Sequence, residues 1–221
     1  MVSDGLFVTG TDTEVGKTAI TALIARGMVL AGRSPVAMKP LATGSASPGE
    51  DARALGLAAG HPPEVWRCWP TPCAPHRAAR LAGAAVPMED CLRWIRRHRQ
   101  PWLVEGVGGW RVPLAPGWDI SRLACALALP VVVVSANRLG TLNHTLLTFE
   151  AVQAAGLNVV AVVLNSGVVG ASGVETTLGR GNLEDLSAAL PGVPVLPMPI
   201  IEVSNRDRLA MGLAKRVGAL G

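Results

Sequence analysis

Hydrophobic residues follow two alternating spacings along the chain. Short apolar runs that end at Gly, Pro, Ser or Asn predict strands, and the segments between them, with apolar residues three and four apart, predict helices. Strands and helices that alternate in this way predict an α/β fold with a doubly wound, mainly parallel sheet flanked by helices. The predicted strands are residues 5–9, 35–39, 102–106, 131–136, 159–165 and 193–198, and the predicted helices are residues 17–31, 89–98, 121–127, 141–155, 183–190 and 206–220.

Composition agrees with a sheet that is covered on both faces. Hydrophobic residues make up 49% of the chain and aromatic residues only 4%, and the predicted strands are rich in Val, Leu and Ala. Parallel strands buried on both sides have such continuous apolar runs. The 221 residues suit a single domain over residues 1–221, since a chain of this length can bury most of its surface. Segments 43–51, 60–75 and 167–181 are rich in Gly, Pro and small polar residues, which predicts surface loops.

The chain shows no signal for a membrane or an oxidising compartment. No apolar run reaches the roughly 20 residues that span a bilayer, and residues 1–8 lack the basic start and the cleavage site of a signal peptide. The four cysteines, Cys68, Cys73, Cys91 and Cys125, form no C-x-x-C pair and have no histidine at ligand spacing. We therefore expect a cytoplasmic protein with no membrane partner and with reduced cysteines used for packing.

The net charge of +4 raises the question of a nucleic-acid partner. The arginines are scattered, except for Arg93, Arg96, Arg97 and Arg99 on one predicted helix. A solvated helix face explains this cluster better than a nucleic-acid site does, so we expect no nucleic-acid partner.

Lysine is rare in this chain. Of the 20 Lys and Arg residues only three are lysines, Lys17, Lys39 and Lys215. An ammonium group is a compact point charge that fits beside a phosphate or a carbamate where a planar guanidinium does not. The few retained lysines therefore indicate sites that require this geometry, and two of them lie in the motifs described next.

A phosphate-binding loop is predicted between the first strand and the first helix. Residues 10–18 read Gly-Thr-Asp-Thr-Glu-Val-Gly-Lys-Thr, which resembles a Walker A loop. In such a loop backbone N–H groups and the helix N-terminus hold phosphate oxygens, the lysine (Lys17) reaches the transferred phosphoryl group, and the hydroxyl (Thr18) binds Mg²⁺. Five residues rather than four separate Gly10 from Gly16, which departs from the strict pattern. The placement between a strand and a helix still predicts nucleotide binding.

Charged residues stand at or near the ends of the next two predicted strands. Lys39 ends one and Glu105 the other, and both should lie near Lys17 because ligands bind at the carboxyl ends of parallel strands. Lys39 alone also fits a solvated strand end, but the scarcity of lysine favours a functional role. Asp51, at the start of a further helix, fits either an N-terminal cap or a metal ligand. Together Thr18, Asp51 and Glu105 would form an all-oxygen magnesium site.

Five stretches, in order along the chain, resemble the dethiobiotin synthetase family. They are residues 10–18, Lys-Pro-Leu-Ala-Thr-Gly at 39–44, Ala-Pro-His at 74–76, Val-Glu-Gly-Val-Gly-Gly-Trp at 104–110 and Leu-Gly-Thr-Leu-Asn-His at 139–144. The resemblance covers residues 5–165 and is weaker beyond. The additional residue in the phosphate loop is itself a trait of that family.

The resemblance implies an ATP- and Mg²⁺-dependent ligase of biotin biosynthesis with a P-loop NTPase fold. In that family, diaminopelargonic acid takes up CO₂ as a carbamate, ATP phosphorylates the carbamate, and the second amine closes the ureido ring of dethiobiotin. It also implies a homodimer in which the partner subunit helps to hold the substrate tail. The expected partners are thus small molecules and a second copy of the chain.

The family's residue roles carry over to matching positions. Lys17 and Lys39 would stabilise the carbamate and the developing charge, which is electrostatic catalysis, and Thr18, Asp51 and Glu105 would bind Mg²⁺. The nucleotide would contact Glu14, Val15, Gly16, Lys17, Thr18, Ala19, Asp51, Glu105, Gly106, Val107, Gly108, Asn165, Pro199, Ile200 and Ile201, of which the last four match positions that contact the adenine base. The substrate would contact Thr13, Lys39, Thr43 and the N–H groups that open a helix at Gly140, Thr141, Leu142 and Asn143.

Other interpretations remain open at this point. A partitioning or positioning ATPase of the same fold usually carries a second lysine within the phosphate loop, where this chain has Thr11 to Thr13. An amide synthetase acting on corrinoids normally carries a glutaminase domain, for which 221 residues leave no room. A plain strand-end turn explains Pro199 as well as a nucleotide contact does. His76 and His144 have no evident carboxylate to orient them, so packing or capping is favoured over acid–base catalysis.

Overall fold

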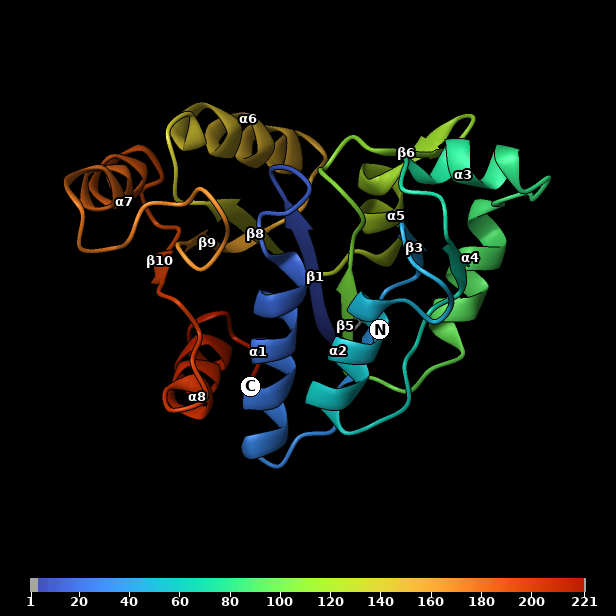
Figure 1. The fold of residues 1–221 in the computed structure, drawn as a ribbon, viewed down its shortest axis with the longest axis horizontal. Coiled ribbons are helices and arrows are strands. Elements are labelled where there is room, and N and C mark those ends of the chain that lie inside the picture. Colours follow the sequence, from blue (N-terminus) through green and yellow to red (C-terminus); the bar gives the residue numbers. More distant parts are fainter. Residues whose placement is uncertain (1–3, 221) are drawn as a thin grey trace.

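A six-stranded parallel sheet forms the centre of the computed structural model, which describes residues 4–220 (Figure 1). The strand order is β10-β9-β8-β1-β5-β2, and each neighbouring pair is parallel. This confirms the predicted fold class and all six predicted strands. The strands are β1 (Gly5–Gly10), β2 (Val36–Met38), β5 (Trp102–Glu105), β8 (Val131–Ala136), β9 (Val159–Asn165) and β10 (Val195–Met198).

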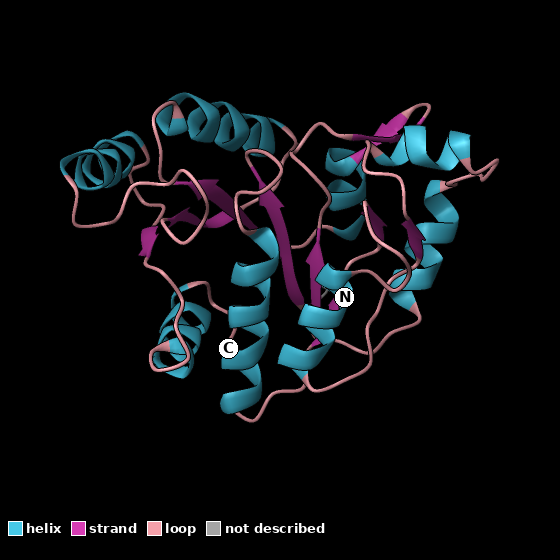
Figure 2. Cartoon of the chain, viewed as in Figure 1, coloured by secondary structure: helices cyan, strands magenta, loops and turns pink. Residues whose placement is uncertain are grey.

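Helices cover both faces of this sheet, as Figure 2 shows in cyan around the magenta strands. One face is packed by α1 (Lys17–Leu30), α2 (Glu50–Ala59) and α8 (Arg206–Arg216). The other face is packed by α4 (Met88–Arg96), α5 (Ile120–Leu127), α6 (Thr141–Ala154) and α7 (Thr177–Ala189). The short helix α3 (Pro75–Leu81) lies beside two small sheets, β3 (Leu41–Thr43) with β4 (Arg67–Trp69), and β6 (Pro113–Ala115) with β7 (Trp118–Asp119).

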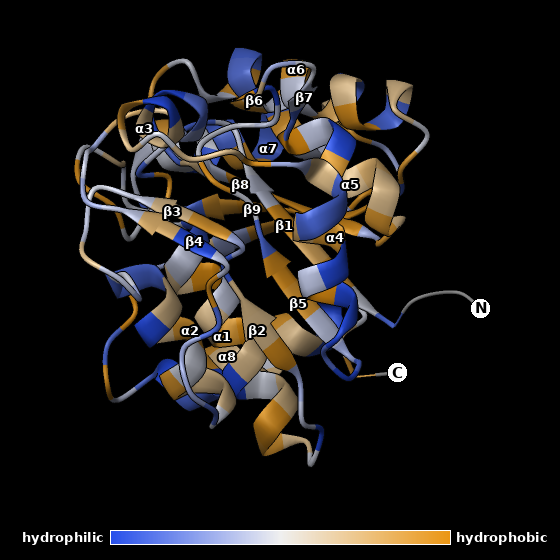
Figure 3. Ribbon diagram, turned by 90° about the vertical axis from the view of Figure 1, so that its right-hand side faces the viewer, coloured by the Kyte–Doolittle hydropathy of each residue, from blue (hydrophilic) through white to orange (hydrophobic). Residues whose placement is uncertain are grey.

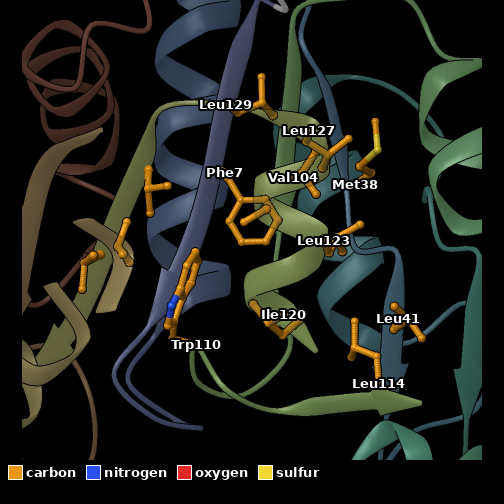
Figure 4. Close-up of a cluster of buried hydrophobic side chains, with 14 of the residues drawn as sticks. Phe7, Met38, Leu41, Val104, Trp110, Leu114, Ile120, Leu123, Leu127 and Leu129 are labelled. Carbon is orange, nitrogen blue, oxygen red and sulfur yellow. The ribbon is translucent and has the colours of Figure 1, made fainter. Parts of the chain in front are cut away.

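Successive residues of each strand belong to opposite cores, since strand side chains alternate between the two faces. In β1, Leu6 and Val8 pack with α1 and α8, whereas Phe7 packs with the other helix layer. Figure 4 shows the Phe7 ring among side chains of that second core, including Val104 and Ile120. A shift of one residue in register would exchange the two sets, so apolar burial fixes where each strand ends. The site at the strand ends is therefore placed by the core.

The structure corrects the three loop predictions. The segment predicted as a loop at 60–75 contains β4, and α3 begins at Pro75. Within 43–51, β3 extends to Thr43 and α2 begins at Glu50. Helix α7 begins at Thr177, not at residue 183, because the Thr176 hydroxyl accepts a hydrogen bond from the Gly179 N–H and caps the helix. Strands β6 and β7 were not predicted, because two or three residues are too few to show a period.

The surface agrees with the assignment of the arginine cluster to a solvated helix face. In Figure 3 the most hydrophobic residues follow the strands and the helix sides that face them, and hydrophilic residues lie outside. On α4, Arg93 is exposed and pairs with Asp90 one turn away. Within residues 4–220 no helix is long and apolar enough to cross a membrane. The four cysteines are unpaired thiols in this part of the chain, with Cys91 buried.

Candidate functional site

The ends of β1, β2 and β5 meet at one edge of the sheet. Val8 is in register with Glu105, and Met38 is in register with Val104. Lys39 follows Met38 directly, so its side chain emerges beside Glu105. The structure therefore brings together the residues that the sequence indicated at this edge.

The phosphate loop between β1 and α1 is held open for an anion. Gly16 adopts a left-handed backbone with φ of 88° at the N-terminus of α1, and no side chain caps the helix there. The first N–H groups of α1 are thus free of side-chain acceptors and suit phosphate oxygens. The Lys17 ammonium lies within this loop and donates to the Asp12 carbonyl at 2.7 Å. Burial, with a smaller contribution from the Lys39 charge, lowers the pKa of Lys17 to about 8.

Three oxygen-bearing side chains converge next to this loop. The Thr18 hydroxyl lies 2.8 Å from Asp51 Oδ1 and 2.8 Å from Glu105 Oε1. A hydroxyl has one proton, so it cannot donate fully to both carboxylates. Glu105 Oε2 is buried and has no hydrogen-bond partner among the described residues. The cluster thus has more acceptor oxygens than donors.

Lys39 supplies the positive charge beside these carboxylates. Its Nζ lies 2.5 Å from Glu105 Oε1 and 3.0 Å from Asp51 Oδ2, and it donates to the Gly106 carbonyl at 3.1 Å. Burial alone would lower the pKa of Lys39, but the charges of Glu105 and Asp51 outweigh it and raise that pKa. Burial likewise opposes the ionised form of Asp51, and the Lys39 charge outweighs it and lowers the pKa of Asp51. Both groups are therefore charged at neutral pH.

The position of Asp51 rules out one of its two interpretations. The N-terminal cap of α2 is Gly49, and no side chain caps this helix. Asp51 lies inside the first turn, and its carboxylate contacts Thr18 and Lys39 instead. The interpretation as a cap is therefore wrong, and Asp51 belongs to the oxygen cluster.

A cleft of about 680 Å³ opens above the cluster. Lys17, Lys39 and both carboxylates line it, as do the predicted substrate residues Thr13 and Thr43. The rest of the lining includes residues that were not predicted as site residues, namely Pro72, Cys73, Ala74, Pro75 and Val112. The Ala-Pro-His string at residues 74–76 was the available signal for this part of the lining. His76 itself lies near the Pro113 carbonyl, at 3.3 Å from Nδ1.

The residues predicted to contact the base lie on the other side of the phosphate loop. Asn165 donates from Nδ2 to the Val15 carbonyl at 3.1 Å and accepts from the Gly167 N–H at 3.0 Å. Its amide therefore supports the phosphate loop directly. Ala19 and Ile201 line a second depression of about 510 Å³ along the outer side of α1. Pro199 and Ile200 follow β10 beside Gly167.

The residues that open α6 do not line the 680 Å³ cleft. Gly140 ends the loop before α6 in a left-handed conformation with φ of 89°, and no side chain caps the helix. The Thr141 side chain is buried, Leu142 is half-buried, and Asn143 is exposed. The structure thus separates Gly140, Thr141, Leu142 and Asn143 from the other predicted substrate residues of the same chain.

Known proteins resemble this chain over most of its length. A family model described as an AAA domain matches residues 4–198. A protein of Ralstonia nicotianae named ATP-dependent dethiobiotin synthetase BioD is 40% identical over 205 residues, which cover 87% of this chain and 90% of the relative. A protein of the same name from Anaeromyxobacter sp. is 41% identical over 215 residues, covering 93% and 88%.

A solved structure supports the fold alone. The signal recognition particle receptor FtsY from Elizabethkingia anophelis is 13% identical, has a TM-score of 0.52, and aligns with 97% of this chain and 65% of its own. The two dethiobiotin synthetases show the family as well as the fold, because their sequence identity to this chain exceeds one third over nearly the whole of both sequences. The chain therefore belongs to the ATP-dependent dethiobiotin synthetase family.

Proposed function

We propose that this chain is an ATP- and Mg²⁺-dependent ligase that forms dethiobiotin from 7,8-diaminopelargonic acid and CO₂. The observation that carries the proposal is the convergence of two ammonium groups, Lys17 and Lys39, with Thr18, Asp51 and Glu105 at the floor of one cleft. A cleft of about 680 Å³ is within the range that holds small molecules. The names of the relatives support ATP as a substrate and dethiobiotin as the product.

The oxygen cluster fits a magnesium ion. Mg²⁺ binds oxygen ligands, commonly one or two carboxylates together with substrate phosphates. Thr18, Asp51 and Glu105 would hold it, since their oxygens converge and Glu105 Oε2 lacks a partner in the described residues. Bound there, Mg²⁺ would supply positive charge against the phosphate oxygens of ATP.

The two lysines would act on opposite ends of the reacting group. A carbamate oxygen of the substrate attacks the γ-phosphorus and releases ADP, and the second amine then attacks the carbamoyl carbon and releases phosphate. Lys17 and the α1 N-terminus would hold the phosphate oxygens, and Lys39 would hold the carbamate. Because both ammonium groups are buried, their attraction for developing negative charge is less screened than in water.

The loops around α1 would make the remaining contacts with the nucleotide. The phosphates would lie against Glu14, Val15 and Gly16, and the turn formed by Gly106, Val107 and Gly108 adjoins the same cleft. We assign the base to the side of Asn165, Pro199, Ile200 and Ile201. The 510 Å³ depression next to Ala19 and Ile201 supports this assignment, because it offers an apolar surface at the start of α1.

We also propose that two copies of the chain form the complete site in the cytoplasm. Gly140, Thr141, Leu142 and Asn143 would then hold the substrate carboxylate of the partner subunit, since they do not line their own cleft. Leu139, which is 86% exposed, and Leu147, which is 58% exposed, lie on either side of this turn. Exposed leucines of this kind fit an interface between subunits.

The test is a reconstituted reaction. The full chain is incubated with ATP, MgCl₂, bicarbonate and diaminopelargonic acid, and ADP and the cyclic product are measured by liquid chromatography with mass spectrometry. We expect ADP and dethiobiotin in equal amounts, with turnover that requires the diamine. Lys17→Gln should abolish product, and Lys215→Gln should retain it, because Lys215 is exposed on α8. ATP turnover that does not depend on the diamine would refute the substrate assignment.

A further inference from the structure

Four hydroxyl groups, that of Thr11 half-buried and the other three buried, connect the phosphate loop to the first turn of α6. Thr11, in the phosphate loop, donates to Ser135 Oγ at 3.4 Å. Ser135, near the end of β8, lies 2.6 Å from Thr141 Oγ1, and Thr145 donates to Ser135 at 2.9 Å. Ser135, Thr141 and Thr145 are buried. The residues joined by the first bond are 124 positions apart in sequence, so the contact is purely tertiary.

The directions of these bonds follow from the number of protons. A hydroxyl has one proton to donate and two lone pairs to accept. Ser135 accepts from Thr11 and from Thr145, so its own proton goes to Thr141. The hydrogen bonds therefore run from Thr11 through Ser135 to Thr141 without a free position at Ser135. One oxygen atom thus joins three threonines, and the bond from Thr11, at 3.4 Å, is the longest of the three.

Two further contacts support the same connection. The Thr11 N–H donates to the Val134 carbonyl of β8 at 3.0 Å. Arg138, in the loop before α6, lies 3.8 Å from Asp12 of the phosphate loop, on the exposed side. Figure 1 shows the β1–α1 loop beside α6. The phosphate loop and the start of α6 are thus in contact on a buried and on an exposed side.

We propose that Thr11 and Ser135 are positioning residues, which hold the first turn of α6 in a fixed place relative to the phosphate loop through the Thr141 hydroxyl. This inference rests on the proposed function, in which N–H groups of that turn bind the substrate carboxylate. Because the Thr141 side chain is buried and bonded to Ser135, the backbone N–H of Thr141 would be the group that binds the substrate. In the proposed dimer, these hydrogen bonds connect the phosphate loop of one subunit to its α6 turn, which binds the substrate in the partner's cleft.

Displacement of the first turn of α6 should weaken binding of the diamino acid more than binding of ATP. Thr11→Val keeps the shape of the side chain and removes one hydrogen bond. We expect the KM for the diamino acid to rise by about fivefold, the effect of one hydrogen bond, while the Kd for ATP stays unchanged. Thr11→Ser restores the hydroxyl and should restore the KM.

Thr21 provides the matched control. Its buried hydroxyl donates to the Lys17 carbonyl at 2.8 Å within α1 and does not reach α6. Thr21→Val therefore removes a hydrogen bond of another threonine hydroxyl without touching the connection to α6. The Tm of Thr21→Val should fall at least as much as that of Thr11→Val, because the lost bond is shorter and fully buried. Its KM for the diamino acid should equal that of the unmodified protein.

A double-mutant cycle distinguishes hydrogen bonds that position the α6 turn together from hydrogen bonds that act independently. If the bonds act as one connection, Thr11→Val combined with Thr141→Val should raise the KM no further than the larger single effect. Should Thr141→Val fail to fold, Ser135→Ala takes its place in the cycle. Additive effects, an unchanged KM in Thr11→Val, or an equal rise in Thr21→Val would each overturn the inference. Absence of diamine-dependent turnover in the unmodified protein would instead overturn the proposed function, and the inference with it.

Discussion

Removal of the Lys39 ammonium should affect stability and catalysis in ways that Mg²⁺ separates. In Lys39→Gln, Glu105 and Asp51 lose their shared counter-charge, to which Nζ lies at 2.5 and 3.0 Å. Breaking a buried ion pair costs about 3–5 kcal/mol. The Glu105 side chain is 0% exposed but that of Asp51 is 43% exposed, so we take the lower end, about 3 kcal/mol.

This loss is large enough to measure by thermal unfolding. For a chain of this length 1 kcal/mol shifts Tm by roughly 2–4 °C, so Lys39→Gln should lower Tm by about 6–12 °C in the presence of a chelator. Mg²⁺ should recover most of that loss, because a divalent cation between the same carboxylates replaces the missing charge. Product formation should stay absent at any Mg²⁺ concentration, and ATP affinity should stay nearly intact, because Lys39 is assigned to the carbamate.

Lys215→Gln is the control, because it removes a lysine from an exposed position of α8. Its Tm should equal that of the unmodified protein, both in the presence and in the absence of Mg²⁺. The reasoning fails if Lys39→Gln unfolds at the temperature of the unmodified protein, or if Mg²⁺ stabilises both variants equally. Loss of ATP affinity in Lys39→Gln would contradict the assignment of Lys39 to the carbamate.

Three further outcomes follow from the structure. Gly27→Ala should destabilise the fold by about 1–3 kcal/mol in chemical denaturation, because a Cβ at residue 27 would lie 2.3 Å from the Ala210 carbonyl oxygen of α8. Gly212→Ala is the control: a Cβ there meets open space, so this change should stabilise α8 by up to about 1 kcal/mol. Asp51→Asn should raise the Mg²⁺ concentration for half-maximal activity by roughly tenfold or more and leave the maximal rate less affected. Burial raises the pKa of Cys91 to about 12, so the thiol stays protonated at pH 8, and mass spectrometry after iodoacetamide treatment should find Cys91 labelled only in the unfolded protein.

The sequence predicted the sheet well because apolar burial decides it. The strands at 131–136 and 159–165 have the predicted bounds, since a buried parallel strand has a continuous apolar run that other elements lack. The phosphate loop was equally visible, as its residues are contiguous. Both features depend on local sequence.

Features that depend on tertiary distances were not predictable in the same way. From the sequence, Asp51 fitted both a cap and a metal ligand. Thr18 and Asp51 are 33 positions apart, and only the packing of α2 beside α1 brings their oxygens to 2.8 Å. Asn165 was expected at the base, yet its amide also holds the Val15 carbonyl across 150 positions. The cleft wall at Pro72 and Cys73 lies in a segment whose prolines predicted only a loop.

The geometry of the site offers a physical reason for a lysine at residue 39 in a chain that contains few lysines. Lys39 contacts two carboxylates and one carbonyl from a single nitrogen atom, in a place where the same oxygens are proposed to bind Mg²⁺. An arginine would form a planar two-point contact with one carboxylate, which would hold that carboxylate in a geometry suited to the guanidinium. An ammonium has no preferred plane and can turn from the carboxylates to a carbamate without moving its backbone. If Lys39 holds the carbamate as we propose, a lysine suits residue 39 better than an arginine, because one ammonium can then change partners during the reaction.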